Sequence, residues 1–167
     1  MNILFAGSPH SAAEVLDSLS NESNINIKAV ITQPDKRGKR GSKLIESAVA
    51  NKARSLNIKT FKPEDLDNEN LKAELSSIEF EFLIVVAYGK IIPSWLLNLP
   101  TVSPINIHFS ILPKYRGASP IQSAILNGDT STGISIIKIN NKLDAGDIYS
   151  VFELSLIHIS EPTRRLS

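Results

Sequence analysis

The chain alternates short apolar runs with amphipathic segments from its first residues onward. Residues 2–6, NILFA, form a nearly continuous apolar run, which is typical of a strand buried on both faces of a parallel sheet. Residues 9–19 carry apolar side chains at helical spacing. This pattern predicts a helix with Ser8 as its N-cap and Pro9 at its first position.

The same alternation continues along most of the chain. Further strands are expected at residues 25–32, 58–61, 80–88, 105–108, 133–139 and 147–153, and further helices at 44–56, 63–77, 93–99 and 117–126. Residues 80–88, FEFLIVVAY, are the most apolar and β-branched segment and predict the central strand. The last two strands are expected to form a hairpin. Alternating strands and helices predict an α/β fold with a doubly wound, mostly parallel sheet and its sites at the carboxyl ends of strands.

Composition narrows the class of protein. At 167 residues, with 42% hydrophobic and 21% charged residues, the chain suits one globular domain with a core. A net charge of +1 gives no overall bias toward nucleic acid or membrane, and the absence of cysteine excludes disulfides, thiolate chemistry and Cys-based zinc sites. No apolar run approaches the roughly 20 residues of a membrane span, and the N-terminus lacks the pattern of a signal peptide. We therefore expect a cytoplasmic protein.

One local departure from neutrality lies at residues 35–43, DKRGKRGSK, which hold five cations and no apolar residue. Such a segment cannot pack and is predicted to be a mobile surface loop. A solvated surface is one interpretation, and contact with the phosphates of a nucleic acid is the other. No aromatic residue interleaves, so contact would be with the backbone of the nucleic acid and not with its bases.

The strongest candidates for catalytic residues are Asn106 and His108. They lie at the end of an apolar strand that leads into a loop with Pro113 and Gly117. Because side chains alternate along a strand, Asn106 and His108 share a face and lie about 7 Å apart. An amide donor then stands beside a titratable imidazole. A histidine near a strand end is more often a hydrogen-bonded structural residue than a catalyst, so both interpretations stay open.

A carboxylate is expected at the same edge of the sheet. Asp144, in NNKLDAGDIY, matches the Asp-x-Gly pattern of an ordinary hairpin turn. It also follows the strand at 133–139, so it could hold the imidazole's tautomer and favour its protonated form. Asp147 is the alternative carboxylate. The turn Gly7-Ser8-Pro9 lacks the G-x-G-x-x-G pattern, which disfavours NAD.

Several segments together resemble one family. NIHFSILPKYRGASPI and TGISIIKINNKLDAGDIY resemble the signature segments of the 10-formyltetrahydrofolate-dependent formyltransferases, and FAGSP, ITQPDKRGKRGSKL and VVAYGKIIP are similar to further segments in the same order. The resemblance covers about residues 1–153. It implies a Rossmann-like formyltransferase fold and an enzyme that transfers a formyl group from 10-formyltetrahydrofolate to an amine, with no metal.

The resemblance also implies residue roles. Asn106, His108 and Asp144 match the family's catalytic triad, in which an amide and an imidazolium can stabilise an oxyanion while Asp144 keeps the ring protonated or relays a proton. The pterin of the folate would lie against the loop at 86–92, and the loop at 141–146 would close over it. The implied cofactor-binding residues are Val86, Ala87, Tyr88, Gly89, Ile91, Ile92, Ser110, Leu112, Pro113 and Leu143.

The implied amine substrate is initiator methionyl-tRNA. The basic segment resembles the insertion that enters the acceptor end of the tRNA, and its implied RNA-binding residues are Lys36, Arg37, Lys39, Arg40 and Lys43. Glycinamide ribonucleotide formyltransferases share the Asn-His-Asp set. Sugar formyltransferases share RGASPI more nearly and are the closest alternative. A third hypothesis, after the tRNA and sugar formyltransferases, is a non-catalytic module that binds folate or RNA.

The resemblance ends before the chain does. Family members continue past the position of Glu153 with more of the catalytic domain, and the tRNA enzymes add a C-terminal barrel domain, which this chain is expected to lack. We therefore expect an incomplete catalytic domain over residues 1–154, with impaired activity. Residues 155–167 are expected to be a tail from a truncated or chimeric reading frame. A monomer is expected.

Overall fold

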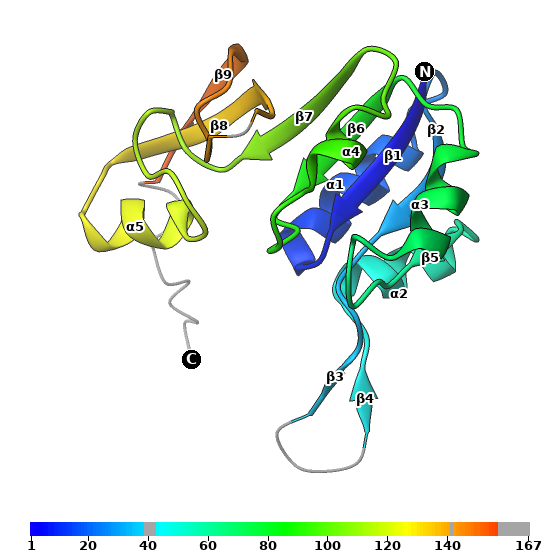
Figure 1. The fold of residues 1–167 in the computed structure, drawn as a ribbon. Coiled ribbons are helices and arrows are strands. Elements are labelled where there is room, and N and C mark those ends of the chain that lie inside the picture. The colour runs from blue at the N-terminus through cyan, green and yellow to red at the C-terminus, as the bar shows by residue number, and fades with distance from the viewer. Residues whose placement is uncertain (39–42, 141, 157–167) are drawn as a thin grey trace. The chain divides into compact units, whose positions relative to one another are not determined.

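The computed structural model describes residues 1–38, 43–140 and 142–156. The chain forms two compact units, Met1–Asn106 and Ile107–Ser167, named here unit 1 and unit 2 (Figure 1). Residues 157–167, which hold most of the predicted tail, lie outside the described part of the chain. Among the described residues, no helix is long and apolar enough to cross a membrane.

Unit 1 is built on parallel strands. They are β1 (Asn2–Gly7), β2 (Asn26–Ile31), β5 (Thr60–Phe61), β6 (Phe82–Val86) and β7 (Ser103–His108). Their order is β5-β2-β1-β6-β7, and the pairings β1–β2, β1–β6, β2–β5 and β6–β7 are all parallel. The last two residues of β7 belong to unit 2. The predicted parallel sheet with the 80–88 segment near its centre is therefore confirmed.

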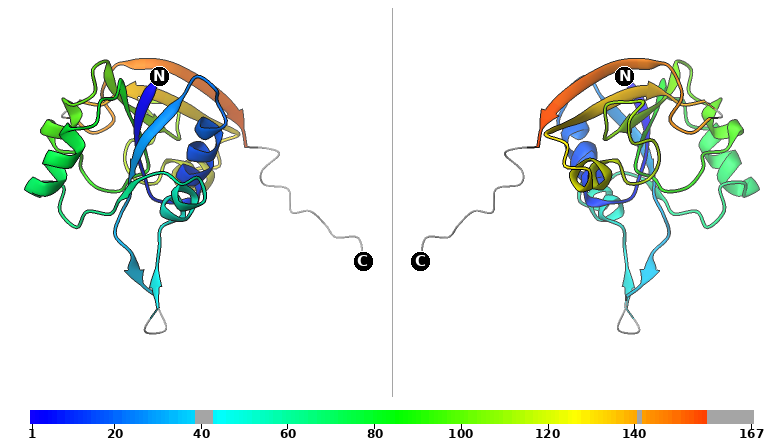
Figure 2. Two further views of the ribbon diagram at one scale, coloured as in Figure 1. Left: turned by 90° about the vertical axis from the view of Figure 1, so that its right-hand side faces the viewer. Right: turned by 90° about the vertical axis from the view of Figure 1, so that its left-hand side faces the viewer.

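Helices cover both faces of this sheet. Figures 1 and 2 show α1 (His10–Ser20) and α2 (Ala48–Ser55) on one face, and α3 (Glu69–Ser76) and α4 (Ser94–Leu97) on the other. This arrangement confirms the doubly wound prediction. The chain order of the strands reverses between β1 and β6, and in open α/β sheets ligands bind outside the carboxyl ends of strands at such a switch point.

The core of unit 1 follows from the apolar runs. Leu4, Phe5 and Leu83 are fully buried in the sheet, and Leu16 of α1 is fully buried against it. Since β1 has helices on both faces, all its residues except the first are buried. Burial of each such side chain contributes roughly 1.5–3 kcal/mol relative to exposure. The packing of β1 and β6 therefore fixes the position of the loops that leave the carboxyl ends of these two strands.

Two residues of the basic segment, Lys36 and Arg37, form a strand where the sequence predicts a mobile surface loop. β3 (Lys36–Arg37) and β4 (Leu44–Ile45) pair antiparallel and form an arm that projects from unit 1 (Figure 1). The strand forms at these two residues because ladder hydrogen bonds join main chains and need no apolar side chain. The exposure of Lys36, Arg37 and Lys43 agrees with the predicted surface position. Lys39 and Arg40 lie outside the described residues.

Helix α2 begins at Ala48, so the predicted start at residue 44 is wrong. The Ser47 hydroxyl caps the helix by accepting a hydrogen bond from the Ala50 amide at 2.9 Å. Leu44 and Ile45 fit the helical period, but each is 59% exposed and lies in β4. The local cap therefore overrides the periodicity.

Other helix starts also differ from their predictions. Ser8 does not cap α1. Its N-cap is Pro9, and no side chain caps this end. α3 begins at Glu69 instead of residue 63 because Asn68 caps it, its Oδ1 accepting from the Leu71 amide at 3.1 Å. α5 (Pro120–Leu126) begins three residues after Gly117, whose φ of +101° is not helical.

Unit 2 contains a β-hairpin and the helix α5. β8 (Ser131–Lys138) and β9 (Ile148–Ser155) pair antiparallel from Ser131 opposite Ser155 to Ile137 opposite Ile148. The register shifts between Ile136 and Ile137. The predicted hairpin is confirmed, and α5 contacts β8. His108 ends β7, and the other site residues of unit 2 lie on the loops that follow β7 and β8.

Candidate active site

His108 ends β7 and is 5% exposed. Its Nδ1 lies 3.7 Å from Oδ2 of Asp144, and its Nε2 lies 2.9 Å from the main-chain oxygen of Tyr115. Because a carbonyl oxygen only accepts, Nε2 donates to it. An oxygen acceptor therefore faces each ring nitrogen, and the protonated ring can donate from both.

Asp144 is both a turn residue and the partner of His108. It has a φ of +46°, and its side chain is 9% exposed. Its Oδ2 also accepts a hydrogen bond from the Gly117 amide at 2.8 Å. The turn is tight, because a Cβ added at Gly146 would overlap the main-chain oxygen of Lys138. The turn thus holds the carboxylate beside the imidazole, whereas Asp147 is exposed.

The loop that follows His108 is fastened to β8 by a buried serine. The Ser135 hydroxyl accepts from the Leu112 amide at 3.0 Å and donates to the main-chain oxygen of Ser110 at 2.7 Å. Ser135 is fully buried. The Ser110 hydroxyl, also fully buried, donates to the main-chain oxygen of Lys114 at 2.6 Å. Ser110 therefore shapes the loop, and its predicted cofactor contact stays a prediction.

Tyr115 presents the carbonyl that faces His108. Its φ is +55°, and its hydroxyl donates to Oδ2 of Asp129 at 2.8 Å and accepts from the Asn127 side chain at 3.2 Å. The hydrogen bond to Asp129 raises the pKa of Tyr115 above its usual value. Sequence reasoning missed Ser135, Asn127 and Asp129. A serine between two isoleucines of a buried strand was the one available signal.

Asn106 is the last residue of unit 1. It is half-buried on β7 and lies opposite Val85 of β6 in the ladder, two residues before His108. Its role beside His108 and Asp144 stays a prediction.

The loop at 86–92 leaves β6 at the switch point. Val86 and Tyr88 are buried, whereas Ile91 is 93% exposed. Ala87 and Gly89 have φ of +46° and +83°. The main-chain oxygen of Tyr88 accepts from Ser8 Oγ at 3.2 Å and from Gln33 Nε2 at 2.8 Å. Burial raises the pKa of Tyr88 to about 12. The loop is therefore anchored by Tyr88 and leaves an apolar side chain outside.

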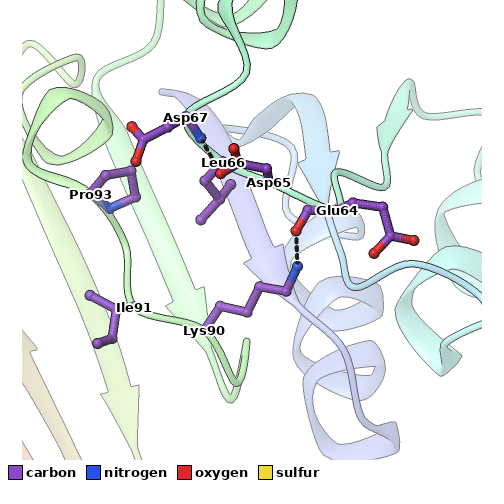
Figure 3. Close-up of a pocket in the computed structure, with 7 residues that line it drawn as sticks. All are labelled: Glu64, Asp65, Leu66, Asp67, Lys90, Ile91 and Pro93. Carbon is purple, nitrogen blue, oxygen red and sulfur yellow. Dashed lines mark hydrogen bonds between the residues drawn. The ribbon is translucent and has the colours of Figure 1, made fainter.

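A pocket of about 310 Å³ borders this loop on the α3 side. Figure 3 shows its lining, which comprises Glu64, Asp65, Leu66, Asp67, Lys90, Ile91 and Pro93. Lys90 Nζ donates to the main-chain oxygen of Glu64 at 2.8 Å, and Trp95 Nε1 donates to Oδ1 of Asp67 at 3.1 Å. The sequence predicted that residues 64–67 would belong to a helix over residues 63–77, so this pocket was not foreseen.

The remaining predicted contacts lie on loops of unit 2. Leu112 is 7% exposed and Leu143 is 73% exposed, Pro113 is exposed, and the Leu112–Pro113 peptide bond is cis. Asn141, which begins the predicted closing loop, lies outside the described residues. Within the described ranges, no group of three or more His, Asp or Glu side chains could hold a metal ion.

The arm carries exposed cations, and ion pairs hold the residues where it joins unit 1. Lys36, Arg37 and Lys43 are exposed. At the base, Lys62 Nζ bonds Asp35 at 2.7 Å and Glu46 at 2.8 Å, and these acids flank the two strands of the arm. The arm is therefore joined to the body of unit 1 on both sides.

Comparison with known proteins gives one consistent result. A family model described as formyl transferase matches residues 1–166. The chain is 44% identical over 157 residues to the methionyl-tRNA formyltransferase of Buchnera aphidicola subsp. Schizaphis graminum, covering 94% of this chain and 50% of that protein. The predicted family is therefore confirmed. The chain spans about half the length of the curated relatives it matches.

Solved structures agree on the fold. The phosphoribosylglycinamide formyltransferase from Anaplasma phagocytophilum aligns with a TM-score of 0.75 at 23% identity, over 93% of this chain and 72% of that one. A sugar 3N-formyl transferase, solved in the presence of dTDP and 5-N-formyl-THF, aligns with a TM-score of 0.64 at 27% identity, over 93% of this chain and 52% of that one.

Proposed function

We propose, since the chain belongs to the formyl transferase family, that it carries the catalytic residues of an enzyme that formylates the amino group of initiator methionyl-tRNA. The observation that carries this proposal is the buried pair of His108 and Asp144, 3.7 Å apart. The formyl donor is 10-formyltetrahydrofolate. The name of the Buchnera relative supports the choice of amine.

In the proposed reaction the amino nitrogen of the methionyl group attacks the formyl carbon. A carbon–nitrogen bond forms, and the carbonyl electron pair moves to oxygen in a tetrahedral intermediate. The bond from that carbon to the folate nitrogen then breaks, the carbonyl re-forms, and the proton lost by the attacking amine goes to the departing folate nitrogen. No oxidant or reductant is needed.

In these reaction steps, His108 is proposed to supply a positive charge and a hydrogen-bond donor. Because Nδ1 faces Asp144, the nitrogen that would reach the formyl oxygen is Nε2, and the formyl oxygen would replace the Tyr115 carbonyl as its acceptor. The Asn106 amide is proposed as a second donor to the same oxygen. Asp144 balances the charge of the ring and fixes its orientation. Protonation of the leaving nitrogen then proceeds through His108.

Cofactor contacts are proposed from position and exposure. The loop at 86–92 stands at the switch point, where ligands of such sheets bind. Ile91 is an exposed apolar side chain of this loop, and it is proposed as a contact for the flat pterin ring. The remaining residues implied by the family resemblance, Leu143 among them, are proposed on that resemblance alone.

The arm is proposed to bind the tRNA backbone through Lys36, Arg37 and Lys43, with Lys39 and Arg40 completing the set. Exposed cations that contact phosphates release counterions, so affinity for tRNA should fall steeply with salt. We further propose that the protein works in the cytoplasm as a monomer. The division into a domain over residues 1–154 and a foreign tail stays a prediction, and resequencing the gene beyond the codon for Leu154 tests it.

The test is a formyl-transfer assay of the 167-residue chain with 10-formyltetrahydrofolate and two amines, initiator methionyl-tRNA and a nucleotide-linked amino sugar. Formylation of the tRNA, lost in Asp144→Asn, supports the proposal. Transfer to the sugar alone would replace it with the second candidate, which the sugar 3N-formyl transferase structure favours. Folate binding without turnover, with turnover restored by joining the C-terminal half of a relative, would identify a fragment that binds but does not catalyse.

A further inference from the structure

The main-chain oxygen of Tyr88 is held from outside its own loop. Gln33 Nε2 donates to it at 2.8 Å and the Ser8 hydroxyl donates to it at 3.2 Å. A Cβ added at Gly89 would overlap Gln33 Nε2. The Gln33 side chain therefore lies directly against the Tyr88–Gly89 peptide, and the absence of a side chain at Gly89 makes this contact possible.

Gln33 is itself held in place by a polar network at the end of β2. Its main-chain amide donates to Ser8 Oγ at 3.2 Å. The Thr32 hydroxyl lies 3.4 Å from Ser8 Oγ and 2.6 Å from Ser47 Oγ, and Ser47 caps α2. Thr32 is fully buried. The side-chain amide of Gln33 thus projects from a network that joins the ends of β1 and β2 to the start of α2.

We propose that Gln33 is a positioning residue for the folate, acting through the main chain of the loop at 86–92. By holding the Tyr88 carbonyl it sets the plane of the Tyr88–Gly89 peptide. This plane decides where the middle of the loop offers an amide donor to a heterocyclic ligand. The inference rests on the proposed function, which makes this loop the folate contact.

The chemistry of the contact requires a neutral donor of glutamine's length. Leucine would leave the Tyr88 carbonyl with the longer bond from Ser8 alone. Glutamate would place a carboxylate against a carbonyl oxygen, and only its protonated form could donate. Gln33 is half-buried and outside the apolar core, so its replacement opens no core cavity.

Lys62 provides a matched control from the same part of unit 1. Its described bonds go to Asp35, two residues along the chain from Gln33, and to Glu46, both at the base of the arm. Lys62→Met therefore disturbs the arm while the bonds to the Tyr88 carbonyl remain.

The experiment is calorimetric titration of the 167-residue chain and its variants with 5-N-formyl-THF. Gln33→Leu should bind about five- to tenfold more weakly, since one hydrogen bond that orders the loop is lost. Lys62→Met should bind within twofold of the wild type. Gln33→Glu should bind weakly at pH 7.5, and its affinity relative to the wild type at the same pH should rise as the pH falls toward 5. A merely structural role would not produce this rescue.

Hydrogen exchange separates this inference from the proposed function. In Gln33→Leu without ligand, the amides of residues 87–92 should exchange faster, while those of β1 stay protected. If the wild type does not bind 5-N-formyl-THF, the proposed function fails and the exchange result alone decides whether Gln33 positions the loop. Unchanged loop exchange, wild-type affinity in Gln33→Leu, or equal weakening in Lys62→Met would overturn the inference.

Discussion

Replacing Ser135 with alanine tests the contact that holds the loop behind His108. The Ser135 hydroxyl is fully buried and joins the Leu112 amide, at 3.0 Å, and the Ser110 carbonyl, at 2.7 Å, to β8. Ser135→Ala removes both bonds and leaves a main-chain donor and a main-chain acceptor buried without them. The loop also carries the Tyr115 carbonyl that faces His108 Nε2.

The expected cost follows from these two bonds. A buried polar group left unsatisfied costs about 1–3 kcal/mol, so two groups together cost about 2–4 kcal/mol after local relaxation. The oxygen atom itself is small, and the cavity that it leaves adds little. The loss should be concentrated in unit 2, where both partners lie.

The assay is hydrogen exchange of the β8 amides under native conditions, supported by urea unfolding followed by circular dichroism. Ser123→Ala on α5 is the matched control. Its hydroxyl donates to the Ser119 carbonyl at 2.8 Å in an exposed position, so its loss should change stability by less than about 0.5 kcal/mol. A Ser135→Ala effect as small as that of the control would refute the reasoning.

Three further changes test other parts of the molecule. His108→Ala should lower the rate of formyl transfer about 10²–10⁴-fold with an unchanged circular dichroism spectrum, and a rate within tenfold of the wild type would contradict its role. The hydrogen bond from Lys62 lowers the pKa of Glu46 below its usual 4.5, so the folded carboxylate contributes stability that is present above pH 4.5 and is lost as the pH falls through the lower folded-state pKa. Lys62→Met should flatten this acid limb in urea titrations from pH 3 to 6, and an unaltered limb would contradict the linkage. The Tyr88 hydroxyl is buried without a hydrogen-bond partner among the described residues, so Tyr88→Phe should be neutral or stabilising by up to about 1 kcal/mol at pH 7. Because burial raises the pKa of Tyr88 to about 12, the wild-type chain loses stability as the pH rises from 10 toward 12, and the advantage of Tyr88→Phe should grow over this range. The variant should lack the late phase of an absorbance titration at 295 nm; a persistent late phase would assign it to another tyrosine.

The order of elements could be predicted because the apolar runs are long enough to decide it. The run at residues 2–6 became β1, which is buried on both faces. The segment at 80–88 became β6, in which Leu83, Val85 and Val86 are buried. Helix starts were less predictable. Leu44 and Ile45 continue the helical period but pair with Arg37 and Lys36 across the arm, and hydroxyl and amide caps decide where α2 and α3 begin.

The candidate pair could be predicted because one rule places His108 and Asp144 at the same edge of a sheet. The residues that orient them could not. Ser135 bonds main-chain atoms 23 and 25 residues away, and Gln33 bonds a carbonyl 55 residues away. Such bonds depend on the folded path of the chain, and neither composition nor spacing carries a signal for them.

The fluorescence of Trp95 can report on the pocket lined by residues 64–67, 90, 91 and 93. Trp95 is the sole tryptophan of the sequence, its indole donates to Asp67 in the pocket wall, and the Lys72 ammonium lies 6.0 Å from the centre of its ring. Indole emission responds to nearby charge and to hydrogen bonding. The native fluorescence of the chain therefore originates in unit 1, beside the loop at 86–92, and a change in emission on adding a ligand would report on that neighbourhood without an added label.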